Sequence, residues 1–134
     1  MWWRKRQADA QLGTQARGAS AEALAADFLV AQGARILERN VHCRGGEVDL
    51  IARIDGVIVF VEVRLRRHAA FGGAAASITA AKQRRVVLAA QHWLNGTGRT
   101  YATAPCRFDA ILLDRLDAAA IQWIPGAFDA GGVG

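Results

Sequence analysis

The stretch GEVDLIARIDGVIVFVEVR, from Gly46 to Arg64, predicts two strands joined by a tight turn. Asp55-Gly56 supplies the turn, because a type I′ turn needs positive φ at both of its central positions. The second strand contains VIVFVEV, which is apolar on both faces over most of its length and therefore predicts a central strand of a sheet. Asp49 and Glu62 nevertheless stand inside this apolar hairpin. The hairpin thus predicts both the centre of the fold and a candidate functional site.

The turn also fixes which residues of the two strands face each other. A two-residue loop sets Asp49 opposite Glu62 and Glu47 opposite Arg64. Opposed residues share one face, with Cβ atoms about 4.5–5.5 Å apart, so these four side chains should cluster. Half-buried opposed carboxylates must share a proton or hold a cation, and Mg²⁺ suits such a pair. Alternatively, Glu47 and Arg64 form a salt bridge while the other two acids are solvated. The apolar residues beside Glu62 favour the first interpretation.

The remaining hydrophobic periodicity predicts two helices and three further strands. The helices cover residues 14–32 and 79–95, and the strands cover residues 35–43, 106–114 and 120–124. The order of these elements indicates an α/β fold with a mixed central sheet of about five strands flanked by helices. We expect one domain over residues 14–128, preceded by a basic arm (1–13) and followed by a frayed tail (129–134).

Composition narrows the class of partner. The chain of 134 residues has a formal net charge of +5 and a pI of about 10.2. This charge favours nucleic acid or an anionic membrane surface as a partner, or serves solubility alone. No apolar run reaches the roughly 18–20 residues of a membrane helix, and no signal peptide is recognisable. Cys43 and Cys106 lack metal-ligand spacing and are expected to be free, buried thiols. We therefore expect a cytoplasmic protein whose partner is nucleic acid and not a membrane.

Longer segments resemble a known bacterial family. They are GASAEALAADFLVAQGARILERN, CRGGEVDLIAR, VFVEVRLRR, FGGAAASITAAKQRRVVLAAQHWL, APCRFDAILLD and IPGAF. Together they cover residues 18 to about 128 and resemble the YraN-like family. Asp49 followed by Glu62-Val63-Arg64 is similar to the PD-(D/E)xK signature of nucleases. The resemblance implies a restriction-endonuclease-like fold related to Holliday-junction resolvases. It also implies hydrolysis of nucleic acid, with DNA the first candidate, using Mg²⁺ or Mn²⁺, and it is compatible with a homodimer.

The resemblance also implies roles for individual residues. Asp49 and Glu62 resemble the metal-binding acids, and the backbone carbonyl of Val63 would complete their site. Glu22 matches an acid on the first helix that assists the metal, or else it is an ordinary exposed helix residue. Gln83 resembles the polar helix residue that follows the signature in related nucleases.

Arg64 departs from the signature, which has Lys at this position. A guanidinium is always protonated and so cannot act as a general base, but it can still clamp a phosphate. Glu47, in the family's GE-(I/V)-DL motif, orients the site or pairs with Arg64. A turn at Gly45-Gly46 would place His42 opposite Asp49, where it would support the site or serve only as a strand residue.

Basic residues concentrate around the acidic motif and are predicted to bind the phosphate backbone, unless they are simply solvated surface. They are Arg44, Arg66, Arg67, Lys82, Arg84 and Arg85. Three functions therefore remain open. The first is a metal-dependent endonuclease acting on branched or single-stranded DNA. The second is a catalytically inactive nucleic-acid-binding module, which Arg64 favours. The third is a protein-interaction domain that retains the nuclease fold.

Overall fold

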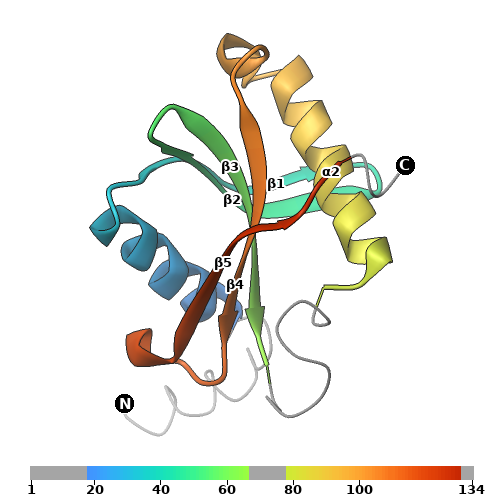
Figure 1. Ribbon diagram of the computed structural model, residues 1–134. Helices are drawn as coiled ribbons and strands as arrows, with labels where there is room; N and C mark the ends of the chain where they lie inside the picture. The colour runs from blue at the N-terminus through green and yellow to red at the C-terminus, as the bar shows by residue number, and fades with distance from the viewer. Residues whose placement is uncertain (1–17, 67–77, 131–134) are drawn as a thin grey trace, which may run out of the picture.

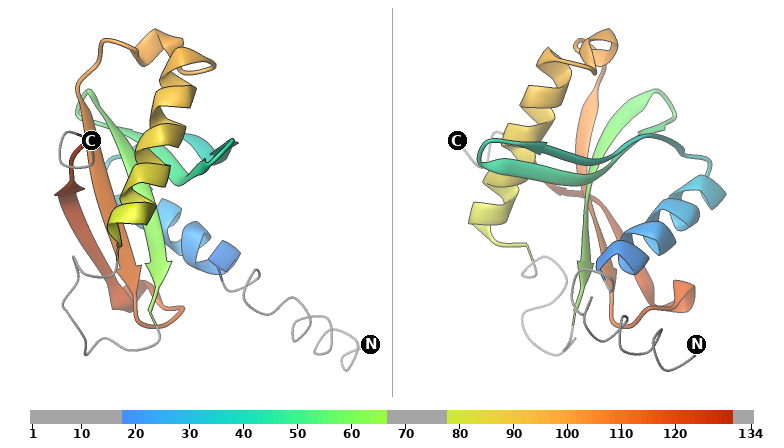
Figure 2. Two further views of the ribbon diagram at one scale, coloured as in Figure 1. Left: turned by 90° about the vertical axis from the view of Figure 1, so that its right-hand side faces the viewer. Right: turned by 180° about the vertical axis from the view of Figure 1, so that it is seen from behind.

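The computed structural model describes residues 18–66 and 78–130. These residues form a five-stranded sheet in the order β1-β2-β3-β4-β5, with one helix on each face (Figures 1 and 2). The strands are β1 (Arg35–Cys43), β2 (Gly46–Ile54), β3 (Val57–Leu65), β4 (Cys106–Leu113) and β5 (Ile121–Phe128). The N-terminal helix occupies residues 18–31 and α2 spans Ala80–Asn95. β3 and β4 are parallel and the other pairs antiparallel, which confirms the predicted mixed sheet. The predicted basic arm, the start of the first helix, and residues 131–134 of the predicted tail lie outside the described residues.

The central strand β3 contributes to two hydrophobic cores, one on each face of the sheet. Val59 and Val61 belong to the core beneath the N-terminal helix. Ile58 and Phe60 belong to the core beneath α2, where Phe60 makes an edge-to-face contact with Trp93. All four β3 side chains are fully buried, and each such burial contributes about 1.5–3 kcal/mol. The apolar run therefore forms a central strand, as predicted.

The turn between β1 and β2 differs from the prediction. Cys43 pairs with Gly46, so the loop is Arg44-Gly45, with Gly45 at a φ of +83°. Consequently His42 faces Glu47, and the prediction that it faces Asp49 is wrong. Gly46 instead begins β2 and lies directly against α2. A Cβ atom on Gly46 would lie 2.5 Å from the carbonyl oxygen of a residue of α2. Glycine is thus needed in the strand for close approach to the helix.

The β1–β2 hairpin bends where Asn40 lies opposite Asp49. Regular pairs flank this position on both sides, and Asn40 has a φ of +51°, which Asn tolerates better than most residues. Before the bend Val48 belongs to the core under α2, and after it Leu50 belongs to the core under the N-terminal helix. The hairpin thereby curves from the N-terminal helix across to α2 (Figure 2).

The same bend separates β2 from β3. Their pairing follows the predicted register from Ile54–Val57 to Leu50–Val61 and ends there. The predicted pairing of Glu47 with Arg64 is therefore wrong, because the part of β2 that contains Glu47 turns toward α2 and does not pair with β3. Asp49 is left at the point where the two strands diverge.

The end of β5, the two cysteines and the length of the helices also bear on the sequence predictions. β5 runs to Phe128, beyond the predicted end at residue 124. The cysteines are free as expected, but Cys106 is exposed at the start of β4 and Cys43 is only half-buried, so the prediction of buried thiols is wrong. No helix among the described residues has the length and apolar character needed to cross a bilayer.

Candidate active site

Three acidic side chains from three different elements meet where β2 leaves β3. Asp49 of β2 is in hydrogen-bonding contact with both Glu62 of β3 and Glu22 of the N-terminal helix. The backbone N–H of Val63 also donates to Asp49 Oδ2, at 2.8 Å. The carboxylate thus binds the β3 backbone just beyond the last regular β2–β3 pair. Asp49 and Glu62 therefore meet as predicted, although the regular β2–β3 pairing ends just before them, and Glu22 joins them from the N-terminal helix.

Burial and the charges of neighbouring carboxylates raise the pKa values of all three carboxyl groups, and Glu47 contributes to each shift. Burial, followed by the charge of Asp49, raises the pKa of Glu62 to about 8, although Lys82 opposes the shift. Burial and then Asp49 likewise raise the pKa of Glu22 to about 7. Burial also raises the pKa of Asp49, despite the N–H of Val63 and hydrogen bonds from both glutamates, which lower it. The three acids therefore lack sufficient positive charge around them, a condition typical of sites that bind a cation or transfer protons.

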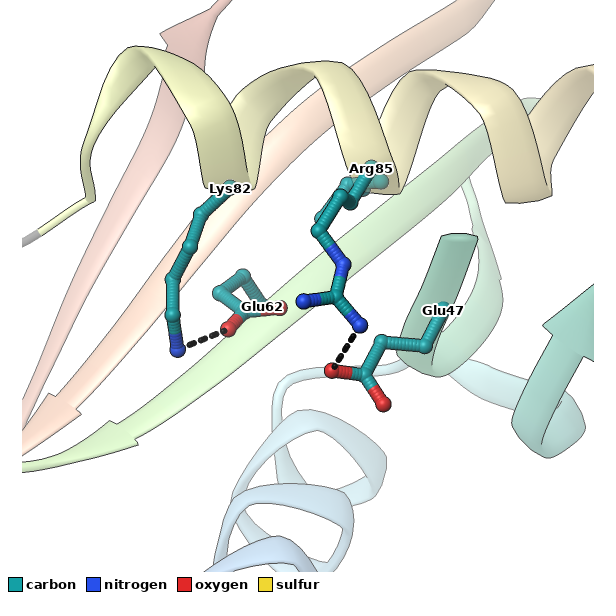
Figure 3. Close-up of a pocket in the computed structure, with 5 residues that line it drawn as sticks. Glu47, Glu62, Lys82 and Arg85 are labelled. Atoms are coloured by element: carbon teal, nitrogen blue, oxygen red, sulfur yellow. Dashed lines mark ion pairs between the residues drawn. The ribbon is translucent and has the colours of Figure 1, made fainter. Parts of the chain in front are cut away.

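Two cations of α2 face the acids of the sheet (Figure 3). Lys82 Nζ lies 3.7 Å from Glu62 Oε1, and Arg85 Nη2 lies 3.5 Å from Glu47 Oε1. The two residues are three apart on the helix, a spacing that places them on the same face. With Val86, these four side chains line a cavity of about 10 Å³, enough for one water molecule.

Glu47 connects this cavity to β1. Its Oε2 atom lies 3.7 Å from Nδ1 of His42, while its Oε1 atom faces Arg85. Glu47 therefore pairs with Arg85 and His42 and not with Arg64, whereas its other predicted role, orienting the site, stays a prediction. His42 reaches the edge of the site through Glu47 and not through Asp49.

The other predicted site residues lie in different environments. Arg64 is half-buried and forms no ion pair with any residue in 18–66 or 78–130. Gln83 donates through Nε2 to the carbonyl of Ile78, at 3.1 Å, so its side chain holds the backbone before α2. Arg66 is largely buried and is paired with Asp114 at 3.0 Å.

Two predicted phosphate-binding residues, Arg44 and Arg84, are exposed in the hairpin turn and on α2. Arg67 lies outside the described residues. Within the described residues, these basic side chains thus divide into exposed cations without an ion pair, cations that face acids, and Arg66, which pairs with the half-exposed Asp114.

Residues 21–113 match the family described as "Uncharacterised protein family UPF0102". The chain belongs to the UPF0102 family. A UPF0102 protein of Methylobacillus flagellatus is 54% identical over 113 residues, covering 84% of this chain and 96% of the relative. A UPF0102 protein of Nitrosomonas europaea is 51% identical over 113 residues, covering 84% and 93% of the two chains. Another, from Cupriavidus taiwanensis, is 54% identical over 123 residues, covering 90% and 88%. The resemblance to the YraN-like family is thereby confirmed.

The donor atoms of this UPF0102 chain fit a hard divalent cation. No three His, Cys, Asp or Glu side chains in the described parts of the chain are arranged to hold a metal by themselves. Asp49 and Glu62 nevertheless supply two adjacent carboxylates with an excess of negative charge. Mg²⁺ commonly takes one or two carboxylates and completes its shell with water and phosphate oxygens. The residues present therefore fit a cation that shares its coordination with a substrate.

One buried acid of the UPF0102 fold was not singled out from the sequence. Asp109 of β4 is completely buried and accepts hydrogen bonds from Arg107, from the indole of Trp123 and from the backbone of Gly126. The signal was present, since CRFDAILLD places an acid in an apolar strand just as the β2–β3 hairpin does. The sequence does not reveal that this acid is fully compensated.

Proposed function

We propose that this protein is a cytoplasmic, metal-dependent phosphodiesterase that cleaves nucleic acid, with branched or single-stranded DNA as the first candidate substrate. The observation that carries the proposal is the convergence of Glu22, Asp49 and Glu62, whose pKa values are all raised, first by burial and then by neighbouring carboxylates. Among the described residues Lys82 is the ammonium that faces them, so positive charge is in deficit. A divalent cation would remove this deficit. The net charge of +5 and the exposed arginines of α2 and of the β1–β2 turn suit a polyanionic substrate.

Asp49 and Glu62 are the residues that would hold Mg²⁺ or Mn²⁺. The carbonyl of Val63 is a third oxygen donor, because the N–H and C=O of one strand residue point toward the same neighbouring strand. The N–H of Val63 already points to Asp49, so its carbonyl faces the same gap. A bound divalent cation would supply an activated water and neutralise charge on the phosphate.

The other residues divide the remaining work. Glu22 contacts Asp49 from the N-terminal helix and so keeps that carboxylate in place. Arg64, half-buried and without an ion pair in the described chain, is available for a phosphate oxygen. Arg44 and Arg84 would bind neighbouring phosphates and give affinity that falls with salt. In the reaction, a water oxygen bonds to phosphorus, the bond from phosphorus to one sugar oxygen breaks, and that oxygen leaves protonated.

The test compares the wild type with Asp49→Asn and Glu62→Gln on branched and single-stranded DNA in the presence of Mn²⁺. We expect each substitution to lower the cleavage rate by about 100-fold or more, the scale of losing a principal electrostatic group of an active site. Asp55→Asn is the matched control, because it makes the same chemical change in the exposed turn of the same hairpin. Failure of the wild type to cleave either substrate would refute the proposal, as would full activity of both site variants.

Arg64 supports a second candidate, a nucleic-acid-binding module without turnover. A guanidinium can bind phosphate but cannot accept a proton from water. This function predicts that the wild type binds DNA but does not cleave it with Mn²⁺. It also predicts that Asp49→Ala leaves the DNA affinity unchanged.

A further inference from the structure

The first turn of α2 holds Lys82 in a fixed position beside the acids. Thr79 caps the helix, and its hydroxyl oxygen accepts a hydrogen bond from the backbone N–H of Lys82 at 3.2 Å. Gln83 fixes the preceding backbone through the carbonyl of Ile78. The helix is anchored further along by Val86, which is buried in the core. The backbone from which the Lys82 side chain extends is therefore well determined.

The Lys82 side chain extends from this anchored turn toward Glu62 (Figure 3). Its Nζ atom lies 3.7 Å from Glu62 Oε1, longer than the 2.7–2.9 Å of a strong charge-assisted hydrogen bond. The side chain is 38% exposed, whereas that of Glu62 is 8% exposed. The ammonium thus neutralises part of the acid charge while its hydrogens remain available to a ligand arriving from solvent.

No other amine in the described residues can take this place. The sequence contains two lysines, Lys82 and Lys5, and Lys5 lies outside the described residues. Arg64 is two residues beyond Glu62 on β3, about 6–7 Å along the strand. Its planar fork is suited to clamping a phosphate from the side, whereas a compact ammonium can approach a single oxygen atom.

We infer that Lys82 is a catalytic residue whose ammonium donates a hydrogen bond to a non-bridging oxygen of the scissile phosphate. This inference rests on the proposed phosphodiesterase function. A cation bound by Glu62 would replace the ammonium as countercharge and release Lys82 toward the substrate. As the water oxygen bonds to phosphorus and the sugar oxygen departs with a proton from water, negative charge grows on the non-bridging oxygens. Lys82 keeps its own protons throughout and stabilises that charge.

The kinetic test compares Lys82→Met and Lys82→Arg with the wild type on the DNA substrate that the wild type cleaves. We expect Lys82→Met to lower kcat by about 100-fold while KM changes by less than about threefold, because the contact strengthens in the transition state. Lys82→Arg retains the charge and should recover part of the lost rate. Arg99→Met is the matched control, because it removes one exposed positive charge beyond the far end of α2, a helix about 24 Å long.

A labelling test detects the contact without measuring turnover. The wild type is treated with an amine-acylating reagent, alone and with single-stranded DNA plus Ca²⁺, and modification of Lys82 is measured by mass spectrometry of its peptide. We expect DNA with Ca²⁺ to slow the acylation of Lys82 several-fold more than DNA without a divalent cation. Equal acylation in both mixtures would overturn the inference.

The outcomes separate this inference from the function on which it rests. A wild type that does not cleave DNA overturns both. The role of Lys82 alone is overturned by a different pattern. In that pattern the wild type cleaves DNA, the Glu62→Gln variant does not, and the Lys82→Met variant has the kcat of the wild type. Lys82→Gln repeats the measurement with a polar side chain, so that a folding defect peculiar to methionine cannot decide the result.

Discussion

The acid of β4, Asp109, and the acid cluster of Glu22, Asp49 and Glu62 have opposite surroundings. In the cluster Glu62 is buried and the other two acids are half-buried. Asp109 is completely buried, yet both of its oxygens are fully used. Oδ1 accepts from Arg107 Nε at 2.8 Å and from the N–H of Gly126 at 2.9 Å. Oδ2 accepts from Arg107 Nη2 at 3.0 Å and from Trp123 Nε1 at 2.9 Å.

The acid cluster formed by Glu22, Asp49 and Glu62 has fewer compensating donors for each carboxyl group. Asp49 accepts one backbone N–H and otherwise meets two further carboxyl groups. Lys82, at 3.7 Å from Glu62, is the ammonium that faces the cluster within the described chain. Burial of an acid therefore does not mark a functional site by itself. A deficit of compensating donors is what favours cation binding, because an uncompensated site gains more free energy from a bound cation than a compensated site does.

The largest effect on stability should come from Asp109. Replacement of Asp109 by Asn removes the partner of the Arg107 guanidinium, whose pKa is raised by this hydrogen-bonded contact. It also turns an amide toward N–H donors. We expect the free energy of unfolding to fall by about 3 kcal/mol, as when one partner of a buried ion pair is removed. Urea denaturation near neutral pH measures the change in the free energy of unfolding. A loss below about 1 kcal/mol would show that the hydrogen bonds and ion pair of Asp109 contribute little to stability.

Glu62→Gln should act in the opposite direction at about pH 8. The folded protein holds the Glu62 proton up to about pH 8, whereas the unfolded chain releases it near pH 4.5. Between these values the folded state binds more protons, so its stability falls as pH rises. The substitution removes this penalty and should raise the free energy of unfolding by about 2 kcal/mol at the upper end of the range. Urea denaturation between about pH 4.5 and pH 8 measures this difference in stability. A Glu62→Gln variant less stable than the wild type at about pH 8 would show that the charge of Glu62 is compensated in the folded protein.

The smallest expected effect is stabilisation by a divalent cation. Mn²⁺ at ten times its dissociation constant should add about 1.4 kcal/mol to the stability of the wild type at about pH 8. The gain should disappear at about pH 5, where the glutamates are protonated, and in the Asp49→Asn, Glu62→Gln double variant. Thermal denaturation with and without Mn²⁺ measures it. An equal shift in the double variant would mean that Mn²⁺ binds elsewhere.

The local sequence determined the central strand and the meeting of Asp49 with Glu62. Asp55-Gly56 set the register of the hairpin, and the structure follows it from Ile54–Val57 to Leu50–Val61. A tight turn and the alternation of side chains fix such a register because they involve only neighbouring residues. The positions of the helices and strands along the chain could be predicted for the same reason, because hydrophobic periodicity also involves only neighbouring residues.

The tertiary structure alone decided how the acids are compensated. The bend at Asn40 took Glu47 away from Arg64, and the packing of α2 brought Arg85 to it instead. The same packing set Lys82 beside Glu62, although 19 positions separate them in the sequence. Asp109 is neutralised by Arg107 of its own strand, but it also depends on β5, which supplies the indole and backbone N–H groups that hydrogen-bond its oxygens. The hairpin sequence specifies where a carboxylate lies, but its electrostatic balance is set by groups that only the folded chain brings within a few ångströms.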